Sequence, residues 1–487
     1  MNPFNRRSFL QLALSGAACS LAPGRVIGAN DRIRIAAIGL GGRGVGIAGQ
    51  AVRLGGVELV ALCDADSKRL DAGAAKLLKQ KAVSEGVRKE TDFRKLLEDP
   101  EIDAVLIATP NHWHALMTVM ACEAGKDVMV EKPVCHTLDE GWRMIEAAKK
   151  QGRIVCGGFQ QRADSGLLAL QDYLKAENDP YGAVTGIHAL WFRLREPIGK
   201  RSTPLTPPDS VDYNLWLGPA ADEPIMRESF HYDWHWRWNT GDGEMANLGS
   251  HHLDIARWFA GDAKSKPVKV TSAGNRFLFD DAGETPNMHW ATFDFGNGIP
   301  VTLQVRDLPI KPGSKAPPSF AGIRSGMVVR FEDAEFRGGR GGGRVHGSDG
   351  KVIKKFPGDG GGEHFPSFFR AMRSRKPEDV RCNLEEAVYS SQGTHLANIA
   401  TRIGVPSDPD AVEKVIADAP ELTKELWQDI NRQMKGFDID HSKEPWLLGS
   451  QLEYDWKARD FVGDSELAKR ARELHQRENR KGWEFPA

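Results

Sequence analysis

The feature that most constrains this chain is a glycine pattern between an apolar strand-like run and a helical stretch. Residues 33–38 form a short strand pattern that is apolar except for Arg34, and Gly39-Leu40-Gly41-Gly42-Arg43-Gly44 follows directly, ahead of the helix-compatible residues 45–54. A second apolar run, residues 57–63, ends at Asp64, twenty positions after Gly44. This order of strand, Gly-x-Gly-x-x-Gly, helix, strand and acid predicts a dinucleotide-binding fold.

Each residue of the pattern has a separate physical role. Gly39 permits a tight turn, Gly41 lets the backbone approach a pyrophosphate, and Gly44 lets helix and strand pack closely. The helix N-terminus adds N–H groups and partial positive charge. A carboxylate at Asp64 accepts hydrogen bonds from adenine-ribose hydroxyls and repels a 2′-phosphate, so NAD is the expected cofactor. Asp66 agrees with NAD, whereas Lys68 and Arg69 keep NADP possible.

Strand and helix patterns continue to alternate after the glycine loop. Apolar strand-like runs at 104–108, 128–130 and 154–156 are separated by helical patterns at 113–124 and 138–150. This alternation predicts an α/β Rossmann domain with a parallel sheet over residues 30–160. Ligands bind beyond the carboxyl ends of such strands. Two clusters fall at these ends, Thr109-Pro110-Asn111-His112-Trp113-His114 and Glu131-Lys132-Pro133.

The pattern changes near residue 183. Runs at 184–194, 268–273, 288–295 and 300–305 read as strands, with Asn297-Gly298 as a hairpin turn. We therefore expect an α+β domain with an open, mostly antiparallel sheet over 161–404. The glycine-rich residues 338–344 are expected at a hairpin tip. Residues 405–487 predict a helical extension (408–436) and a Trp-bearing tail that covers the body or a neighbouring subunit.

Composition narrows the function classes. The chain has 487 residues, 40% of them hydrophobic, which excludes a polytopic membrane protein, a disordered chain and a collagen-like fibre. The 65 Lys and Arg are matched by 66 Asp and Glu, so nucleic-acid binding is not expected. The six Cys are dispersed without a Cys-x-x-Cys pair, which argues against a disulfide framework.

The first residues are expected to be an export signal rather than part of the fold. Arg6-Arg7-Ser8-Phe9-Leu10 precedes a short apolar stretch, as in a twin-arginine signal over residues 1–29. The stretch is too short for a membrane-spanning helix, so stable membrane insertion is not expected. Ala17-Ala18-Cys19 leaves a lipoprotein signal as a weaker alternative. The expected location is the periplasm, reached by the twin-arginine route.

The motifs together resemble the Gfo/Idh/MocA oxidoreductase family, which includes glucose–fructose oxidoreductase and inositol dehydrogenase. The resemblance rests on the glycine loop, Thr109-Pro110-Asn111-x-x-His114 and Glu131-Lys132-Pro133, and extends through Gln160-Gln161-Arg162 and residues 249–254. It implies a nicotinamide over the sheet, a substrate facing it from the second domain, and a homo-oligomer. The expected cofactor contacts are Gly39, Gly41, Gly42, Arg43, Gly44, Asp64, Thr109, Asn111, His114, Glu131, Lys132 and Gln160.

The resemblance also implies catalytic residues. It places Lys132 between nicotinamide and substrate, where an ammonium can polarise the reacting oxygen. His251 matches the second catalytic position, and an imidazole can exchange a hydroxyl proton near neutral pH. Many relatives have Asp four residues before this His, whereas this chain has Asn247, which can orient a group but cannot act as a base. On one continuous helix Asn247, His251, Asp254 and Trp258 would share a face. His251, His252 and Asp254 lack a second ligand cluster, so no metal is expected.

An aromatic-rich segment, His231-Tyr232-Asp233-Trp234-His235-Trp236-Arg237-Trp238, has two interpretations. It is either a core strand with alternating Trp side chains or a sugar-binding surface. On the second interpretation the expected substrate contacts are His235, Trp236 and Arg237, joined by His251 and, on family grounds, by Arg162.

These residues support three functions. The first is an NAD(P)-dependent oxidoreductase that moves hydride to or from a secondary hydroxyl carbon of a sugar, polyol or glycoside, with a retained cofactor. The second is a glycoside hydrolase, lyase or epimerase that acts through transient oxidation. The third is a non-catalytic sugar-binding protein, which the presence of Lys132 and His251 disfavours.

Overall fold

The N-terminal domain is built on a six-stranded parallel sheet. The computed structural model describes residues 31–262 and 264–486, so the twin-arginine segment lies outside the described residues. The strand order is β3-β2-β1-β4-β5-β6, with every neighbouring pair parallel. The order reverses between β1 and β4, which marks the ligand-binding edge of such a sheet. The strands are β1 (Ile33–Ile38), β2 (Val57–Cys63), β3 (Arg88–Glu90), β4 (Ala104–Ile107), β5 (Asp127–Val130) and β6 (Val155–Gly157).

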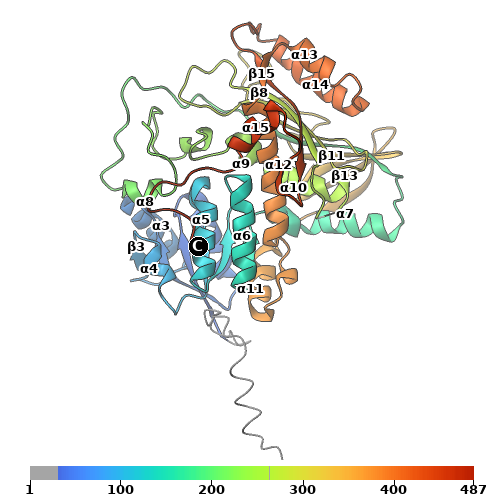
Figure 1. The fold of residues 1–487 in the computed structure, drawn as a ribbon. Coiled ribbons are helices and arrows are strands. Elements are labelled where there is room, and N and C mark those ends of the chain that lie inside the picture. The colour runs from blue at the N-terminus through green and yellow to red at the C-terminus, as the bar shows by residue number, and fades with distance from the viewer. Residues whose placement is uncertain (1–30, 263, 487) are drawn as a thin grey trace, which may run out of the picture.

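Helices cover both faces of this sheet, as the strand–helix alternation predicts (Figure 1). One face packs on α2 (Gly42–Arg53) and α3 (Ser67–Lys79), and on α11 (His364–Ser374), which comes from much later in the chain. The other face packs on α4 (Arg94–Leu97), α5 (Asn111–Glu123) and α6 (Leu138–Lys150). A capping box of Thr137 and Glu140 fixes the start of α6.

The second domain contains an open sheet of eleven strands, and its neighbouring pairs are antiparallel except for β7 with β10. The order is β14-β13-β12-β11-β7-β10-β9-β8-β16-β15, with β17 beside β16. This confirms the α+β expectation. The strands are β7 (Val184–Phe192), β8 (Lys269–Asn275), β9 (Met288–Asp294), β10 (Val301–Arg306), β11 (Ser325–Phe331), β12 (Ala334–Gly339), β13 (Gly342–Gly347), β14 (Val352–Pro357), β15 (Val405–Ser407), β16 (Trp446–Asp455) and β17 (Asp460–Phe461).

Three helices bury one face of this sheet, namely α7 (Ser165–Ala176), α10 (Gly249–Ala260) and α12 (Leu384–Arg402). The opposite face carries the C-terminal extension, in which α13 (Pro409–Val415) and α14 (Glu421–Lys435) pack over Trp290 and Trp446. The single helical stretch expected at 408–436 is therefore two helices. Pro420 stands at the N-cap of α14, because proline lacks an N–H and starts a helix better than it continues one. The smaller helices are α8 (Tyr213–Leu217), α9 (Gly243–Asn247) and α15 (Glu466–Glu473), with 3-10 turns at Gln160–Ala163, Asp233–Trp236 and Pro377–Asp379.

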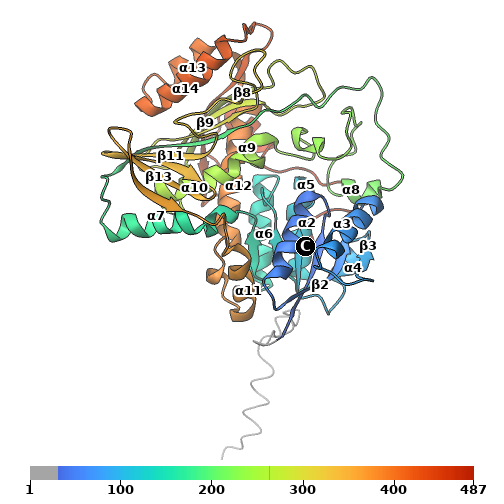
Figure 2. The same cartoon turned by 180° about the vertical axis from the view of Figure 1, so that it is seen from behind.

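Residues 193–242, hereafter the strap, connect β7 to α9 and reach across to the first domain (Figure 2). The strap pairs with the β2–α3 connection, where Ser67 N–H donates to Ser210 O at 2.9 Å and Asp212 N–H to Ala65 O at 2.8 Å. Gly218 (φ 51°) lies so close to Trp113 that an added Cβ would meet the indole at 2.1 Å. The aromatic segment 231–238 lies within the strap as a 3-10 turn and loop, so the core-strand interpretation is wrong.

The tail lies against both domains. Strand β16 joins the second sheet beside β8, and Trp483 packs edge-to-face on Trp113 of α5 with ring centroids 5.0 Å apart. Arg480 donates to Gly218 O of the strap at 2.9 Å. The tail thus covers the body of its own chain, one of the two placements expected from its tryptophans.

Candidate active site

A cavity of about 570 Å³ lies between the glycine loop, the carboxyl ends of β1, β4 and β5, the strap and the start of α10. The cavity is lined by every expected cofactor contact: Gly39, Gly41, Gly42, Arg43, Gly44, Asp64, Thr109, Asn111, His114, Glu131, Lys132 and Gln160. Asn247, His235 and His251 join them from the second domain. Residues from two predicted domains therefore meet in one cavity.

The glycine loop fits a dinucleotide. Gly39 has φ 87°, and an added Cβ would lie 2.5 Å from Ala108 O; a Cβ on Gly44 would lie 1.7 Å from Gly39 O. By contrast, no atom of the residues that the structure describes lies within 4 Å of a Cβ built on Gly42, at the first turn of α2. Gly41 at the N-cap brings no side chain to the N–H groups there. The loop is closed on its protein side and open on its cavity side, as pyrophosphate binding requires.

Asp64 is fixed at the end of β2. Its Oδ2 accepts from Leu40 N–H at 2.7 Å and its Oδ1 from Asp66 N–H at 2.9 Å. Burial raises the pKa of Asp64, although these two backbone donors oppose the shift. The carboxylate is therefore oriented before any ribose arrives. Arg69 lines the same part of the cavity, so a cation is available beside Asp64.

The floor of the cavity is made by Glu131 and its partners. Arg43 Nε donates to Glu131 Oε1 at 2.7 Å, and Gln160 Nε2 donates to the same oxygen at 3.3 Å. Burial would raise the pKa of Glu131, but the Arg43 guanidinium outweighs burial and lowers it. His114 lies between Pro133 O (2.6 Å) and Thr109 O (2.9 Å), and burial lowers its pKa. His114 thus lies between the loops that follow β4 and β5, with a carbonyl oxygen facing each ring nitrogen.

Lys132 points from the end of β5 toward the second domain. Its Nζ donates to Asn247 Oδ1 at 2.9 Å and also to the Asn247 backbone oxygen. Burial lowers the pKa of Lys132 to about 8; Arg43 and Arg195 act in the same direction, whereas Glu131 and Glu244 oppose the shift. Lys132 can therefore hold or release a proton near neutral pH.

His251 and Asn247 both line the cavity, but they do not share one helix. Helix α9 ends at Asn247 and α10 begins at Gly249, so the continuous face expected through 247, 251, 254 and 258 is wrong. Burial lowers the pKa of His251, with nearby Lys132 and His252 adding to the effect. Within the described residues, its Nδ1 has no hydrogen-bond partner. His251 is a neutral imidazole beside Lys132.

The predicted substrate contacts separate into two groups. His235 lines the cavity, stacked on Trp234 with ring centroids 3.6 Å apart. Trp236 is 4% exposed and Arg237 pairs with Glu284 at 2.9 Å; neither lines the cavity.

Arg162 also lies outside the cavity, contrary to its expected placement. Its Nε donates to Asp254 Oδ1 at 2.8 Å, and its Nη1 pairs with Glu386. A fully buried guanidinium must be neutralised by carboxylates, and Asp254 and Glu386 do this at the junction of α10 and α12. The geometry gives Arg162 a structural position.

Sequence reasoning missed several lining residues. Arg193 and Arg195 follow the end of β7, Tyr232 and Trp234 belong to the strap, and Arg340 comes from the β12–β13 hairpin. Arg195 is held by Glu244 of α9, and its Nη1 donates to Tyr232 OH at 3.1 Å. Tyr232 has φ 69°, a rare backbone conformation for a residue with a side chain. It belongs to the aromatic segment 231–238, and that composition was the one sequence signal that could have identified it.

Comparison with known proteins decides the family. The NAD-binding Rossmann-fold model of the Gfo/Idh/MocA oxidoreductases matches residues 33–159, and the model of their C-terminal alpha/beta domain matches residues 189–307. The chain belongs to the Gfo/Idh/MocA oxidoreductase family. Its N-terminal domain is thus an NAD-binding Rossmann domain, as the sequence predicts.

Curated relatives within the family carry hydrolase names. An alpha-N-acetylgalactosaminidase of Shewanella oneidensis and a glycosyl hydrolase family 109 protein of Shewanella baltica are each 33% identical over 174 residues. Each match spans 31% of this chain and only 38% of the relative.

Solved structures share the fold over a wider range. The WlbA dehydrogenase of Bordetella pertussis, in complex with NADH and UDP-GlcNAcA, has a TM-score of 0.55 at 16% identity, covering 76% of this chain and 96% of that one. A levoglucosan dehydrogenase in complex with NADH and levoglucosan has a TM-score of 0.54 at 16% identity, covering 75% and 96%. Within the described residues, no helix is long and apolar enough to cross a membrane.

Proposed function

We propose that this member of the family is an NAD-dependent oxidoreductase acting on a secondary hydroxyl carbon of a sugar, polyol or glycoside. The observation that supports this most is the meeting of Lys132 and His251 in the cavity that the glycine loop and Asp64 also line. A dinucleotide site alone would fit many reactions. A lysine of lowered pKa beside a neutral histidine fits proton transfer to or from a hydroxyl.

The chain's own residues have distinct tasks in this proposal. The start of α2 would hold the pyrophosphate and Asp64 the adenine ribose, while Glu131 and Asn111 would lie toward the nicotinamide end. When bound, NAD supplies the hydride acceptor or donor. Lys132 would take up the hydroxyl proton during oxidation and return it during reduction. His251, a neutral imidazole whose Nδ1 has no partner within the described residues, would hydrogen-bond the same oxygen. Asn247 keeps the Lys132 Nζ in place through the 2.9 Å hydrogen bond.

Retention of the cofactor is part of the proposal. The strap crosses the adenine side of the cavity, where His231 Nε2 lies 2.8 Å from Asp66 Oδ2 and Trp113 Nε1 donates to Trp216 O at 2.9 Å. Leu215, Trp216 and His231 line the cavity from the strap. A dinucleotide under this cover would leave only after the contacts open.

We also propose export to the periplasm by the twin-arginine route. Because that route carries folded proteins, an exported protein could take a retained cofactor with it. Replacing Arg6 and Arg7 by Lys should keep the protein in the cytosol if the signal acts as proposed. An unchanged periplasmic fraction would contradict this part of the proposal.

The decisive test combines cofactor content with turnover. Protein purified without added nucleotide is denatured, and the released nucleotide is identified and quantified. We expect stoichiometric NAD or NADH from wild type and from Lys132→Ala, and turnover of a sugar panel by wild type alone. Full activity in Lys132→Ala would refute the assigned role of the lysine.

Glycoside cleavage through transient oxidation is a second candidate, favoured by the hydrolase names of the partial relatives. Oxidation of one ring hydroxyl would acidify the neighbouring C–H, elimination would release the aglycone, water would add to the resulting double bond, and the hydride would then be returned to the ketone. Lys132 and His251 can serve both proton steps without a carboxylate at position 247. Aglycone release without net NADH formation would favour this reaction over simple dehydrogenation.

A further inference from the structure

A second cavity, of about 340 Å³, lies on the other side of the strap's C-terminal end from the cofactor cavity. Its walls come from the β5–α6 connection, the strap next to α9, one face of α12 and the tail after α15. The proposed reaction uses none of its lining side chains. Its volume is at the low end for small-ligand pockets, which hold about 300–1,000 Å³.

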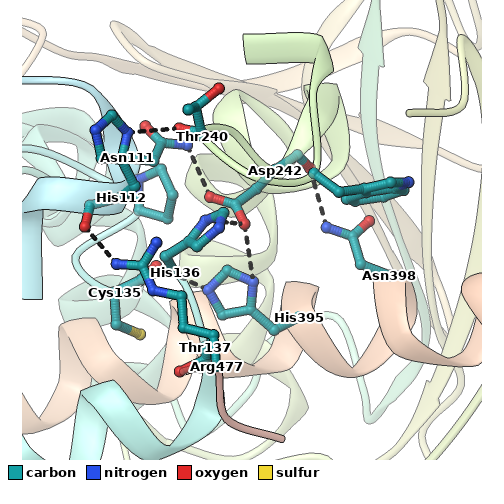
Figure 3. Close-up of polar contacts among 12 residues, drawn as sticks. Asn111, His112, Cys135, His136, Thr137, Thr240, Asp242, His395, Asn398 and Arg477 are labelled. Atoms are coloured by element: carbon teal, nitrogen blue, oxygen red, sulfur yellow. Dashed lines mark hydrogen bonds and ion pairs between the residues drawn. The ribbon is translucent and has the colours of Figure 1, made fainter. Parts of the chain in front are cut away.

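The inner wall of this second cavity is a buried polar cluster around Asp242 (Figure 3). His136 Nδ1 lies 2.9 Å and His395 Nδ1 3.7 Å from Asp242 Oδ1, and Asn111 Nδ2 donates to Oδ2 at 2.8 Å. Asn398 Nδ2 donates to the Asp242 backbone oxygen at 2.9 Å. Burial would raise the pKa of Asp242, but His136 and His395 outweigh burial and lower it to about 2. The wall therefore contains a fixed carboxylate.

Two residues that line the second cavity have buried polar atoms without a hydrogen-bond partner among the described residues. Asn398 is 4% exposed, and its Oδ1 has no hydrogen-bond partner within the described residues. Arg477 uses Nη2 on His112 O and Glu140, whereas its buried Nε and Nη1 find no hydrogen-bond partner in that part of the chain. A buried acceptor and two buried donors without partners are costly, and they indicate an occupant that supplies both kinds of group.

Charge then selects the class of occupant. The cavity is lined by carboxylates (Asp242, Glu473 and Glu478) and by guanidinium groups (Arg402 and Arg477). An anion would therefore lie among carboxylates, and a cation would lie among guanidinium groups. Hydroxyl groups both donate and accept without net charge. Trp238, with the Arg402 guanidinium 4.9 Å from its ring centroid, adds a flat wall at the rim.

We propose that this second cavity is a binding site for a neutral polyhydroxylated molecule of monosaccharide size, separate from the cofactor cavity. The ligand's hydroxyls donate to Asn398 Oδ1 and accept from Arg477 Nε and Nη1. Because Asp242 binds Asn398 through its backbone and Asn111 through its carboxylate, the site adjoins the cofactor cavity through one residue. The proposal does not depend on which reaction the cofactor cavity performs.

The test uses full-length protein with its own cofactor and three neutral probes, glycerol, D-glucose and myo-inositol. Crystals are soaked with each probe, and parallel crystals with acetate. Binding in solution is followed by saturation-transfer NMR. We expect at least one neutral probe on Asn398 and Arg477 in the crystal, and about fivefold weaker binding in Asn398→Leu, the loss expected for one hydrogen bond.

Matched variants separate the second cavity from the first and from general damage. Asn431 of α14 is also 4% exposed with an unpartnered Oδ1, but it lines neither cavity. Asn431→Leu and the cofactor-cavity variant His251→Ala should therefore keep the signal from the second site. If Asn398→Leu fails to fold, the rim variant Arg402→Gln replaces it, with weaker binding expected.

Three outcomes would overturn the proposal: ordered water alone in the cavity with every neutral probe, acetate bound in preference to them, or binding at crystal concentration only. Loss of all probe binding in His251→Ala with none lost in Asn398→Leu would assign the binding to the first cavity and also overturn it.

Discussion

The Nζ of Lys132 donates a hydrogen bond of 2.9 Å to the Oδ1 of Asn247, so the lysine is held by an uncharged acceptor. An amide oxygen fixes the position of the ammonium without the charge that would stabilise its protonated form. Burial lowers the lysine's pKa to about 8, although the carboxylates of Glu131 and Glu244 act in the opposite direction. An asparagine rather than an aspartate at position 247 adds no further negative charge, so Lys132 can exchange a proton near neutral pH.

Asn247→Asp should raise the pKa of Lys132. A carboxylate at this distance raises the pKa of a neighbouring cation by about one to three units. The rate of Lys132 labelling by an amine-reactive reagent, followed by mass spectrometry against pH, measures this without a known substrate. Asn247→Leu removes the acceptor without adding charge and should show no increase. An identical labelling profile for Asn247→Asp and wild type would contradict this account of the site.

The pH dependence of turnover should have opposite signs in the two directions of reaction. Carbonyl reduction needs the Lys132 ammonium, so kcat/KM should fall as pH rises through about 8. Hydroxyl oxidation needs the neutral amine, so kcat/KM should rise toward the same pH. The oxidised nicotinamide is positive and the reduced form is not, so the limb for hydroxyl oxidation should lie at lower pH than the limb for carbonyl reduction. Parallel limbs in the two directions would exclude Lys132 as the titrating group.

Arg162→Met should destabilise the fold rather than weaken substrate binding. The variant leaves Asp254 buried without its main cation, and breaking a buried ion pair costs about 3–5 kcal/mol in the free energy of unfolding. Urea unfolding measures this loss. Arg193→Gln, an exposed arginine at the cavity, is the control and should change stability by about 0.5 kcal/mol or less. If the two variants had the same free energy of unfolding, Arg162 would not be a residue that stabilises the fold.

Asp64→Ala should lower the NAD content of the purified protein. The substitution removes the carboxylate that Leu40 and Asp66 hold in place for the ribose. It also removes the repulsion toward a 2′-phosphate, so with Arg69 nearby the ratio of NADP to NAD affinity should rise about tenfold or more. Titration of nucleotide-free protein with both cofactors measures the ratio. A ratio that does not move would argue against Asp64 as the ribose ligand.

His231→Ala should speed cofactor release. The substitution removes the 2.8 Å contact to Asp66 that ties the strap to the β2–α3 connection. Loss of a hydrogen bond to a charged partner should raise the rate of NAD release about tenfold. Displacement of bound NAD measures this rate. Tyr213→Phe, which loses a 3.2 Å contact to Asp222 within the strap itself, should release NAD at the wild-type rate. Equal rates for all three proteins would mean that the strap does not retain the cofactor.

The strands of the first domain other than β3, and the glycine loop, were predictable because both obey local rules. The glycine loop needs particular backbone conformations, and an acid after the second strand belongs to the same pattern, so spacing placed Gly39, Gly44 and Asp64 at the cavity. Of the second sheet, only β7, β8, β9 and β10 were predicted as strands. Arg162 and Trp236 were misplaced because their partners, Asp254 and the loop at Glu284, are distant in sequence. Sequence periodicity does not show which residues, distant in the chain, will contact each other in the folded protein.

The break between α9 and α10 was equally invisible to a periodicity argument. Residues 243–260 carry no proline, and Leu248 interrupts the helix while Asn247 and His251 still reach the cavity. The second cavity escaped prediction for the same reason as Arg162. It is assembled from the β5–α6 connection, α12 and the tail, which only the folded chain brings together.

The contacts of Arg477, Arg480 and Trp483 link the tail to the cover over the cofactor cavity. These residues contact His112 O, Gly218 O and Trp113, so they brace both the strap and helix α5. The strap and α5 both contribute residues to the lining of that cavity. A change in the tail can therefore alter the cofactor cavity without touching any residue that lines it.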